Sequence, residues 1–241
     1  MPNDQYVGRI AARLRTGEVF DGGFDQLLPL HARAHSLWHW SPVYVAQRAA
    51  VRFAEHGARR VLDVGAGPGK FCIVAGASQP GLEFHGVEQH VELVATAKRL
   101  AELLDLRNVR FSSGDALLAL TGPFDGFYFF NPFFDDPFGA EEHAGLRSEP
   151  PIPRIAAAAI RVTDSLRSAR DRTVVVTYHG LGGPIPSSYD LVCEEPVGSG
   201  CLRTWVKTRA NEESWYYLDE ADDVTRVPRW YVEGLRGQAA Q

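Results

Sequence analysis

The sequence has no long apolar run of the kind that a membrane-spanning helix needs. None of its stretches approaches the roughly 18 consecutive apolar residues of such a span, so we expect no membrane association. The first fifteen residues also lack an apolar core followed by a small-residue cleavage site, as a secretory signal would have. These two absences lead us to expect a cytoplasmic protein.

Cysteine and positive charge are also scarce. Three widely spaced cysteines, without a Cys-x-x-Cys pair, fit neither a disulfide framework nor a zinc site, so we expect free thiols and no metal. The 25 basic residues are outnumbered by 30 acidic ones, which gives a formal net charge of −5. A protein held on nucleic acid by its overall field is usually basic, so the composition disfavours a nucleic-acid partner.

After residue 58 the sequence alternates between apolar strands and amphipathic helices. Strands are expected at 60–64, 82–88, 109–112, 124–130 and 173–178. Helices are expected at 70–77, at 91–104 and around 155–166. This order predicts an α/β fold in three layers, α/β/α, with a doubly wound, Rossmann-like parallel sheet. Two later runs, 189–194 and 201–208, have no helix between them and predict an antiparallel hairpin joined by 195–200.

The pattern divides the chain into three parts. Residues 1–58 are expected to be an N-terminal helical extension or lid, 59–210 the main domain, and 211–241 a C-terminal tail. Within the extension, Ser41 is expected to cap a helix that runs from Pro42 to residue 56. The nearby Trp38 and Trp40 allow two interpretations, closure over a ligand or anchoring of that helix on the core.

A glycine-rich turn follows the first strand, in the segment from Val61 to Phe71. Glycines let the backbone turn tightly and approach a ligand closely, at the strand end where open α/β sheets bind ligands. The segment fails as a phosphate-binding loop, because Phe71 stands where that motif needs Ser or Thr. It also matches a dinucleotide fingerprint incompletely, since Lys70 occupies the third glycine position.

The same turn resembles the cofactor loop of class I methyltransferases, which use S-adenosylmethionine. That loop has an acidic residue, one spacer and then Gly-x-Gly-x-Gly, as in Asp63-Val-Gly-Ala-Gly-Pro-Gly69. The resemblance implies S-adenosylmethionine as the cofactor and a parallel sheet finished by a terminal antiparallel hairpin. It also implies cofactor contacts from the residues of this turn: Asp63, Gly65, Ala66, Gly67 and Gly69.

Two further strand ends carry acidic residues where that family has them. Glu88 ends the second strand, where a carboxylate can accept hydrogen bonds from both ribose hydroxyls, with Gln89 as a secondary contact. By resemblance, Asp115 after the third strand accepts the exocyclic amine of the adenine, and Ala116 lends its backbone amide. A nicotinamide enzyme would also use a carboxylate near position 88, so Glu88 alone does not separate the two cofactors.

The fourth strand leads into Asn131-Pro-Phe-Phe, which resembles the Asn-Pro-Pro-Tyr motif of methyltransferases that act on planar nitrogen. The resemblance gives Asn131 both a cofactor-binding and a catalytic role, beside Pro132 and Phe133. Phe133 replaces the second proline of that motif. An ordinary strand-to-loop turn is the alternative interpretation. His179, at the end of the fifth strand, is a candidate general base, because a neutral imidazole can take up a proton near pH 7.

The whole pattern also resembles a broader group of bacterial methyltransferases, from about Trp38 to Lys207. We therefore expect methyl transfer from S-adenosylmethionine to a nitrogen or oxygen of a small-molecule or peptidic acceptor. A module that binds S-adenosylmethionine without catalysis and an NAD(P)-dependent oxidoreductase are the two alternatives. The sequence leaves the oligomeric state open.

Overall fold

The computed structural model describes residues 4–130, 152–208, 215–220 and 223–239, excluding the side chains of 152–155. Its chain forms two compact units. The first comprises Met1–Phe129 with Arg172–Val176, and the second comprises Phe130–Asp171 with Thr177–Gln241. The three-part division predicted from the sequence stays a prediction.

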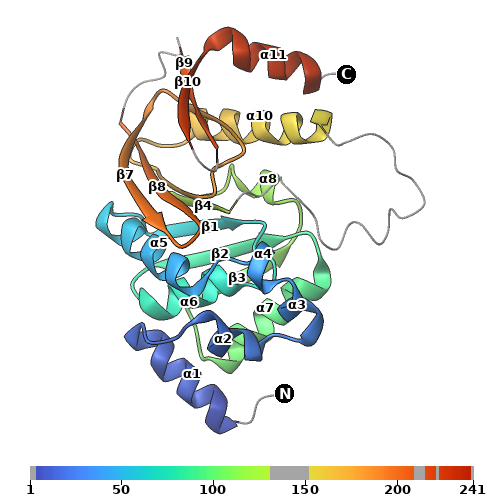
Figure 1. Ribbon diagram of the computed structural model, residues 1–241, viewed down its shortest axis with the longest axis vertical. Coiled ribbons are helices and arrows are strands. Elements are labelled where there is room, and N and C mark those ends of the chain that lie inside the picture. The colour runs from blue at the N-terminus through green and yellow to red at the C-terminus, as the bar shows by residue number, and fades with distance from the viewer. Residues whose placement is uncertain (1–3, 131–151, 209–214, 221–222, 240–241) are drawn as a thin grey trace, which may run out of the picture. The chain divides into compact units, whose positions relative to one another are not determined.

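The first unit opens with short helices and continues as a β/α alternation (Figure 1). Its N-terminal helices are α1 (Asp4–Thr16), α2 (Asp21–Phe24), η1 (Asp25–Leu27), α3 (Leu30–Ala34), α4 (Ser36–His39) and α5 (Val43–Glu55). The alternation that follows is β1 (Arg60–Val64), α6 (Lys70–Ser78), β2 (Glu83–Glu88), α7 (Val91–Leu103), β3 (Val109–Ser113), α8 (Ala116–Ala119) and β4 (Gly126–Phe130). The strands and helices expected from apolar periodicity are present within a few residues of their expected ends.

A seven-stranded, mostly parallel sheet carries the fold, in the order β3-β2-β1-β4-β5-β8-β7. In it β5 is Val174–Tyr178, β7 is Tyr189–Val197 and β8 is Gly200–Lys207. The central strand β1 runs parallel to both neighbours, with Asp63 opposite Gly86 on β2 and Tyr128 on β4. The strand β7 pairs antiparallel with β8. The Rossmann-like fold with a terminal hairpin is therefore confirmed.

The hairpin turn is shorter than the sequence suggested. Its strands extend to Val197 and from Gly200, so the turn consists of Gly198 and Ser199 rather than the whole of 195–200. Pro196 stays within the strand, opposite Cys201. Proline has no N–H to donate, but it is tolerated here because β7 is the edge strand of the sheet.

The expected cap of α5 was wrong. The residue before the helix is Pro42, and the first helical amide, that of Val43, donates to Asp21 Oδ1 at 2.9 Å. The hydroxyl of Ser41 instead shares a 2.8 Å hydrogen bond with the Tyr128 hydroxyl. A distant carboxylate thus does the capping, which no local pattern could have indicated.

The second unit contains a small sheet and a C-terminal helix that the sequence analysis did not predict. Its antiparallel sheet has the order β10-β9-β6, from Val224–Pro228, Trp215–Asp219 and Gly183–Pro186. The helix α11 (Arg229–Ala239) lies along α10 (Ile152–Ser168) (Figure 1). Ile160 of α10, Tyr216 and Val232 form a small core between these elements. The C-terminal residues therefore pack against α10.

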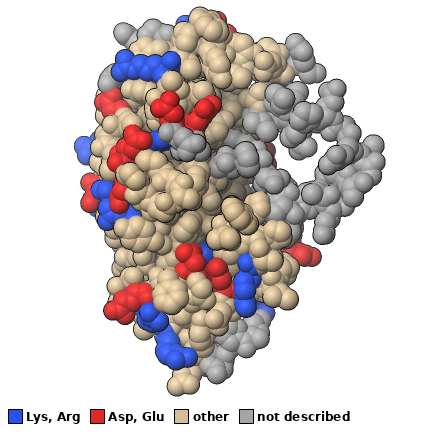
Figure 2. All heavy atoms as spheres, viewed as in Figure 1, with Lys and Arg blue, Asp and Glu red and all other residues tan. Residues whose placement is uncertain are grey.

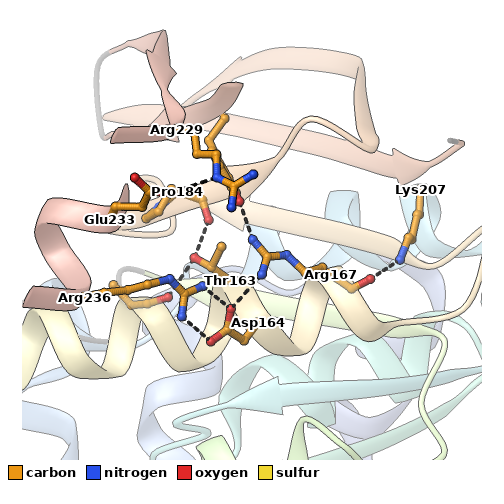
Figure 3. Close-up of polar contacts among 10 residues, drawn as sticks. Thr163, Asp164, Arg167, Pro184, Lys207, Arg229, Glu233 and Arg236 are labelled. Carbon is orange, nitrogen blue, oxygen red and sulfur yellow. Dashed lines mark hydrogen bonds and ion pairs between the residues drawn. The ribbon is translucent and has the colours of Figure 1, made fainter. Parts of the chain in front are cut away.

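Polar contacts surround α10 in this unit (Figure 3). Arg236 of α11 forms a two-pronged ion pair with Asp164, and Arg167 donates to the Tyr216 hydroxyl. At the C-terminal end of α10, the buried Lys207 ammonium donates to the carbonyls of Arg167 (2.5 Å) and Ala169 (2.7 Å). A cation at this end satisfies carbonyls that have no partner within the helix and complements the helix dipole.

Candidate functional site

The glycine turn lies at the carboxyl end of β1, as predicted. Gly65, Gly67 and Gly69 all have left-handed backbone angles, with φ of 79°, 53° and 82°. Side-chain-bearing residues adopt this region at a cost, which explains the residue type at all three positions. The amides of Gly65 and Ala66 donate to the carbonyl of Val87 on β2, at 3.0 and 3.1 Å. The turn is thus tied to the neighbouring strand.

The three glycines differ in what a side chain would meet. A Cβ on Gly67 would lie 2.5 Å from the Trp40 ring, and one on Gly69 would lie 2.5 Å from the ring of Phe111. These two positions need glycine because protein side chains pack directly on them. A Cβ on Gly65 would meet no atom within 4 Å, and this residue is exposed. Gly65 is therefore the position of the turn that a ligand can approach.

Glu88 brings the strand ends together. Its carboxylate accepts the amide of Gly67 at 3.0 Å through Oε2 and the amide of His90 at 2.9 Å through Oε1. Its backbone carbonyl accepts the amide of Gly114, in the loop after β3. Each carboxylate oxygen keeps a lone pair for a further donor. The structure therefore joins the predicted residues of the first two strand ends and places the third loop beside them.

The other predicted cofactor residues lie on the same side of the first unit. Gln89 is exposed and its amide contacts the ring of His90 at 3.4 Å. Asp115 is exposed and caps α8, accepting the Leu117 amide at 2.8 Å, while Ala116 is the half-buried first residue of that helix. The capping bond gives Asp115 a structural role, and its adenine contact stays a prediction.

Asp63 is placed differently from the other acids. Its carboxyl group is buried and accepts a hydrogen bond from the Cys72 thiol of α6, at 3.5 Å. Burial raises the pKa of Asp63 to about 7, and the nearby Glu88 adds to this effect while the thiol opposes it. The carboxyl therefore lies beneath the turn, and a direct contact with the cofactor stays a prediction.

Lys70 is a residue of the site that the sequence analysis treated only as a mismatch. Its side chain is 2 % exposed, and its ammonium contacts Asp21 (2.6 Å), Asp25 (2.7 Å) and Ser36 (2.9 Å). These partners belong to α2, η1 and α4, so the ammonium ties the N-terminal helices to the start of α6. The signal was available, since one lysine opens an otherwise apolar helix.

The two tryptophans before α5 have opposite environments. Trp40 is 8 % exposed, packs on Gly67 and donates its indole N–H to the Ala32 carbonyl at 2.7 Å. Trp38 is 75 % exposed. Ser41, which follows Trp40 in the sequence, forms a hydrogen bond with the Tyr128 hydroxyl. The Tyr128 ring stacks on that of Phe71, with centroids 3.7 Å apart. Trp40 thus borders the glycine turn, whereas Trp38 does not.

The predicted catalytic residues fall in the second unit or outside the described residues. Asn131, Pro132 and Phe133 lie outside them. His179 follows β5 with a left-handed φ of 57°, and its half-buried ring lies near the rings of Phe130 and Tyr178. Such a backbone angle is uncommon for a residue with a side chain and is found often at functional positions. Within the described ranges, no group of three or more His, Cys, Asp or Glu is placed to hold a metal ion.

Comparisons with known proteins agree with this geometry. A family model described as a methyltransferase domain matches residues 55–135, which contain β1 to β4 and the glycine turn. No curated protein sequence matches the chain.

Solved structures share the fold at low sequence identity. TrmN from Thermus thermophilus is 16 % identical, with a TM-score of 0.51, over 71 % of this chain and 51 % of its own. A protein provisionally described as an O-methyltransferase from Klebsiella pneumoniae is 14 % identical, with a TM-score of 0.50, over 87 % and 92 %. An RNA methyltransferase from Salinibacter ruber, solved with S-adenosylhomocysteine, is 17 % identical, with a TM-score of 0.48, over 75 % and 99 %.

The sheet and the glycine turn define the class of a Rossmann-like methyltransferase. The family match identifies a methyltransferase domain over residues 55–135, and domains of this kind use S-adenosylmethionine. The residues present fit that cofactor, because Gly65 leaves an open approach and Glu88 retains acceptor capacity beside it. No helix in the described parts of the chain is long and apolar enough to cross a membrane.

Proposed function

We propose that this enzyme methylates a nitrogen or oxygen atom of a small-molecule or peptidic acceptor. The observation that carries the proposal is the pairing of β1 with β4, with Asp63 opposite Tyr128. Because parallel strands end at the same edge of a sheet, β4 leads its chain toward the edge that holds the glycine turn. Asn131 is the first residue after that strand. The motif residues therefore follow the strand that adjoins the cofactor strand.

The protein's own part in the reaction is to bind and orient. S-adenosylmethionine supplies an electrophilic methyl group on a sulfonium centre, so alignment of the acceptor is the main requirement. In the proposed arrangement the Asn131 side-chain oxygen and the Pro132 carbonyl accept hydrogens from an acceptor amine, and Phe133 lies against it. His179 takes up the proton that the acceptor loses.

The charge of the protein favours such an acceptor over a polyanion. The net charge is −5, and basic and acidic side chains of the described residues are interspersed on the face drawn in Figure 2. Binding to a nucleic-acid backbone depends on concentrated positive charge. The Salinibacter ruber protein acts on RNA by its name, but similarity of fold alone does not transfer a substrate.

Cofactor binding provides the first test, through Glu88. Calorimetric titration of the wild type with S-adenosylhomocysteine is expected to give micromolar or tighter binding. Glu88→Ala should weaken this binding at least 100-fold, because it removes the acceptor of the ribose hydroxyls and of the Gly67 amide. Glu83→Ala, an exposed position at the other end of β2, should bind like the wild type. Equal affinity of the Glu88 variant and the wild type would remove Glu88 from the site.

The acceptor class is tested with a labelled methyl group. Wild-type enzyme and radiolabelled S-adenosylmethionine are incubated with cell extract, which is then separated into small molecules, protein and RNA. Label is expected in the small-molecule or peptide fraction, and Asn131→Ala should reduce its incorporation at least ten-fold. Label that nuclease treatment releases would instead establish an RNA acceptor and contradict the proposal.

The two alternatives raised by the sequence lack support from the comparisons. A binding module without catalysis would bind S-adenosylhomocysteine but transfer no label to any fraction. An NAD(P)-dependent oxidoreductase would bind NADH in the same calorimetric experiment. The cytoplasmic location stays a prediction.

A further inference from the structure

The N-terminal segment reaches the point of the sheet where open α/β folds bind ligands. In the order β3-β2-β1-β4, the chain moves outward from β1 to β2 and β3 on one side and then returns to β4 on the other. Ligands bind at the carboxyl edge beside such a topological switch point. Trp40 packs on Gly67, which follows β1, and Ser41 bonds to Tyr128 within β4. These two residues therefore border the switch point.

The position of Trp40 relative to the cofactor residues is fixed by short contacts. Its six-membered ring lies where a Cβ of Gly67 would be, with two ring carbons at 2.5 and 2.7 Å from that point. The amide of Gly67 in turn bonds to Glu88 Oε2. The indole therefore packs on the residue whose amide binds Glu88, two positions along the turn from the open Gly65. Trp40 is a large aromatic side chain in direct contact with Gly67 of the turn.

The segment that carries Trp40 is held in place by buried charge. The Lys70 ammonium pairs with Asp21 and Asp25 and donates to Ser36. Because Lys70 opens the helix that directly follows the turn, these contacts fix residues 21–36 against the glycine turn itself. The indole N–H bond to Ala32 adds a further tie within the segment. Trp40 is therefore held on the turn from two directions.

We propose that Trp40 contacts the bound cofactor and forms, with residues 21–41, a fixed wall of its site. This inference rests on the proposed cofactor role of Gly65 and Glu88. The indole ring provides apolar contact to the ligand and excludes water from that side of the site. An apolar ring face suits this position because the polar groups of the ligand are matched by Glu88 and the backbone of the turn.

The test compares S-adenosylhomocysteine affinity across variants of the two tryptophans. Trp40→Leu keeps an apolar side chain on Gly67 but loses the ring, and we expect at least ten-fold weaker binding. Trp40→Phe keeps an aromatic ring and should stay within about three-fold of the wild type. Trp38→Ala removes the exposed neighbour and should leave the affinity unchanged. Thermal unfolding of each variant establishes that it is folded.

The outcomes separate this inference from the proposed function. If the wild type binds and Trp40→Leu binds with equal affinity, the proposed role of Trp40 is overturned while the proposed role of Gly65 and Glu88 stands. Absence of binding in the wild type would contradict the proposed role of Gly65 and Glu88. Should Trp40→Leu unfold, Trp40→Phe is compared with Trp40→Tyr and Trp40→His under the same criterion. Equal affinity of the apolar Phe variant and the polar Tyr and His variants would then overturn the proposal.

Discussion

Arg203→Met is expected to lower the free energy of unfolding by about 3–5 kcal/mol, the usual result of removing one partner of a buried ion pair. Arg203 is 1 % exposed, and its guanidinium donates to Asp219 Oδ1 at 2.9 Å and to Glu194 at 3.2 Å. Asp219 is 0 % exposed and also accepts the Leu181 amide. Burial raises the pKa of Asp219, an effect that Arg203 opposes. Urea unfolding of the two proteins measures the difference.

Two variants control this measurement. Arg229→Met removes an arginine of the same unit that forms an exposed pair with Glu233, and about 0.5 kcal/mol or less is expected. Adding Asp219→Asn to Arg203→Met should recover part of the loss, because no unpaired charge then remains buried. A loss no larger than that of Arg229→Met would show that the Arg203 pair contributes little to stability.

Asp63 is expected to make the unfolding free energy fall as the pH rises. Its pKa is about 7 in the folded protein and about 3.8 in the unfolded chain, so the folded state holds the proton more tightly. The stabilising effect of the neutral carboxyl is complete below pH 4 and is lost as the pH passes 7. Between pH 5 and pH 8 the loss from this group alone is about 2–3 kcal/mol.

The comparison with Asp63→Asn isolates this group. The free energy of unfolding of the wild type minus that of the variant should be about 2–3 kcal/mol larger at pH 5 than at pH 8, because asparagine does not titrate. Urea unfolding of both proteins at both pH values, without ligand, gives the four free energies of unfolding. A difference that stays constant with pH would show that Asp63 is ionised throughout the range, as an ordinary carboxylate would be.

The central fold could be predicted from the sequence because its signals are local. Each expected strand from 60 to 178 contains two or more apolar residues. Asp63 lies next to the end of the first strand and Glu88 ends the second. The three glycines of the turn at 65–69 indicate left-handed backbone angles, which glycine adopts more easily than other residues. The shared edge of the sheet at which these residues lie also followed from their positions, since neighbouring parallel strands have their carboxyl ends at the same edge. The contacts of Gly67 and Gly114 with Glu88 agree with that inference.

The remainder depends on contacts between distant residues. The strand β6, which the sequence analysis did not predict, carries Pro184 and Pro186. These prolines are tolerated because β6 is an edge strand. Asp21 caps the helix that begins 22 residues later, at Val43. The Lys70 ammonium forms an ion pair with Asp25, 45 residues earlier. Asp115 was predicted to contact the adenine, and the structure shows that it caps α8, a role that the sequence analysis did not assign. No periodicity encodes such pairings.

The make-up of the first unit also bears on how the protein is synthesised. That unit consists of the chain up to Phe129 and the later segment 172–176. In this segment the Val174 amide donates to the Asp125 carbonyl. At roughly 5–20 residues per second, the ribosome needs several seconds to add the intervening residues. Until β5 is synthesised, β4 lacks the strand that pairs with it on that side of the sheet. The edge that later receives β5 is thus the one that a chaperone would have to protect first.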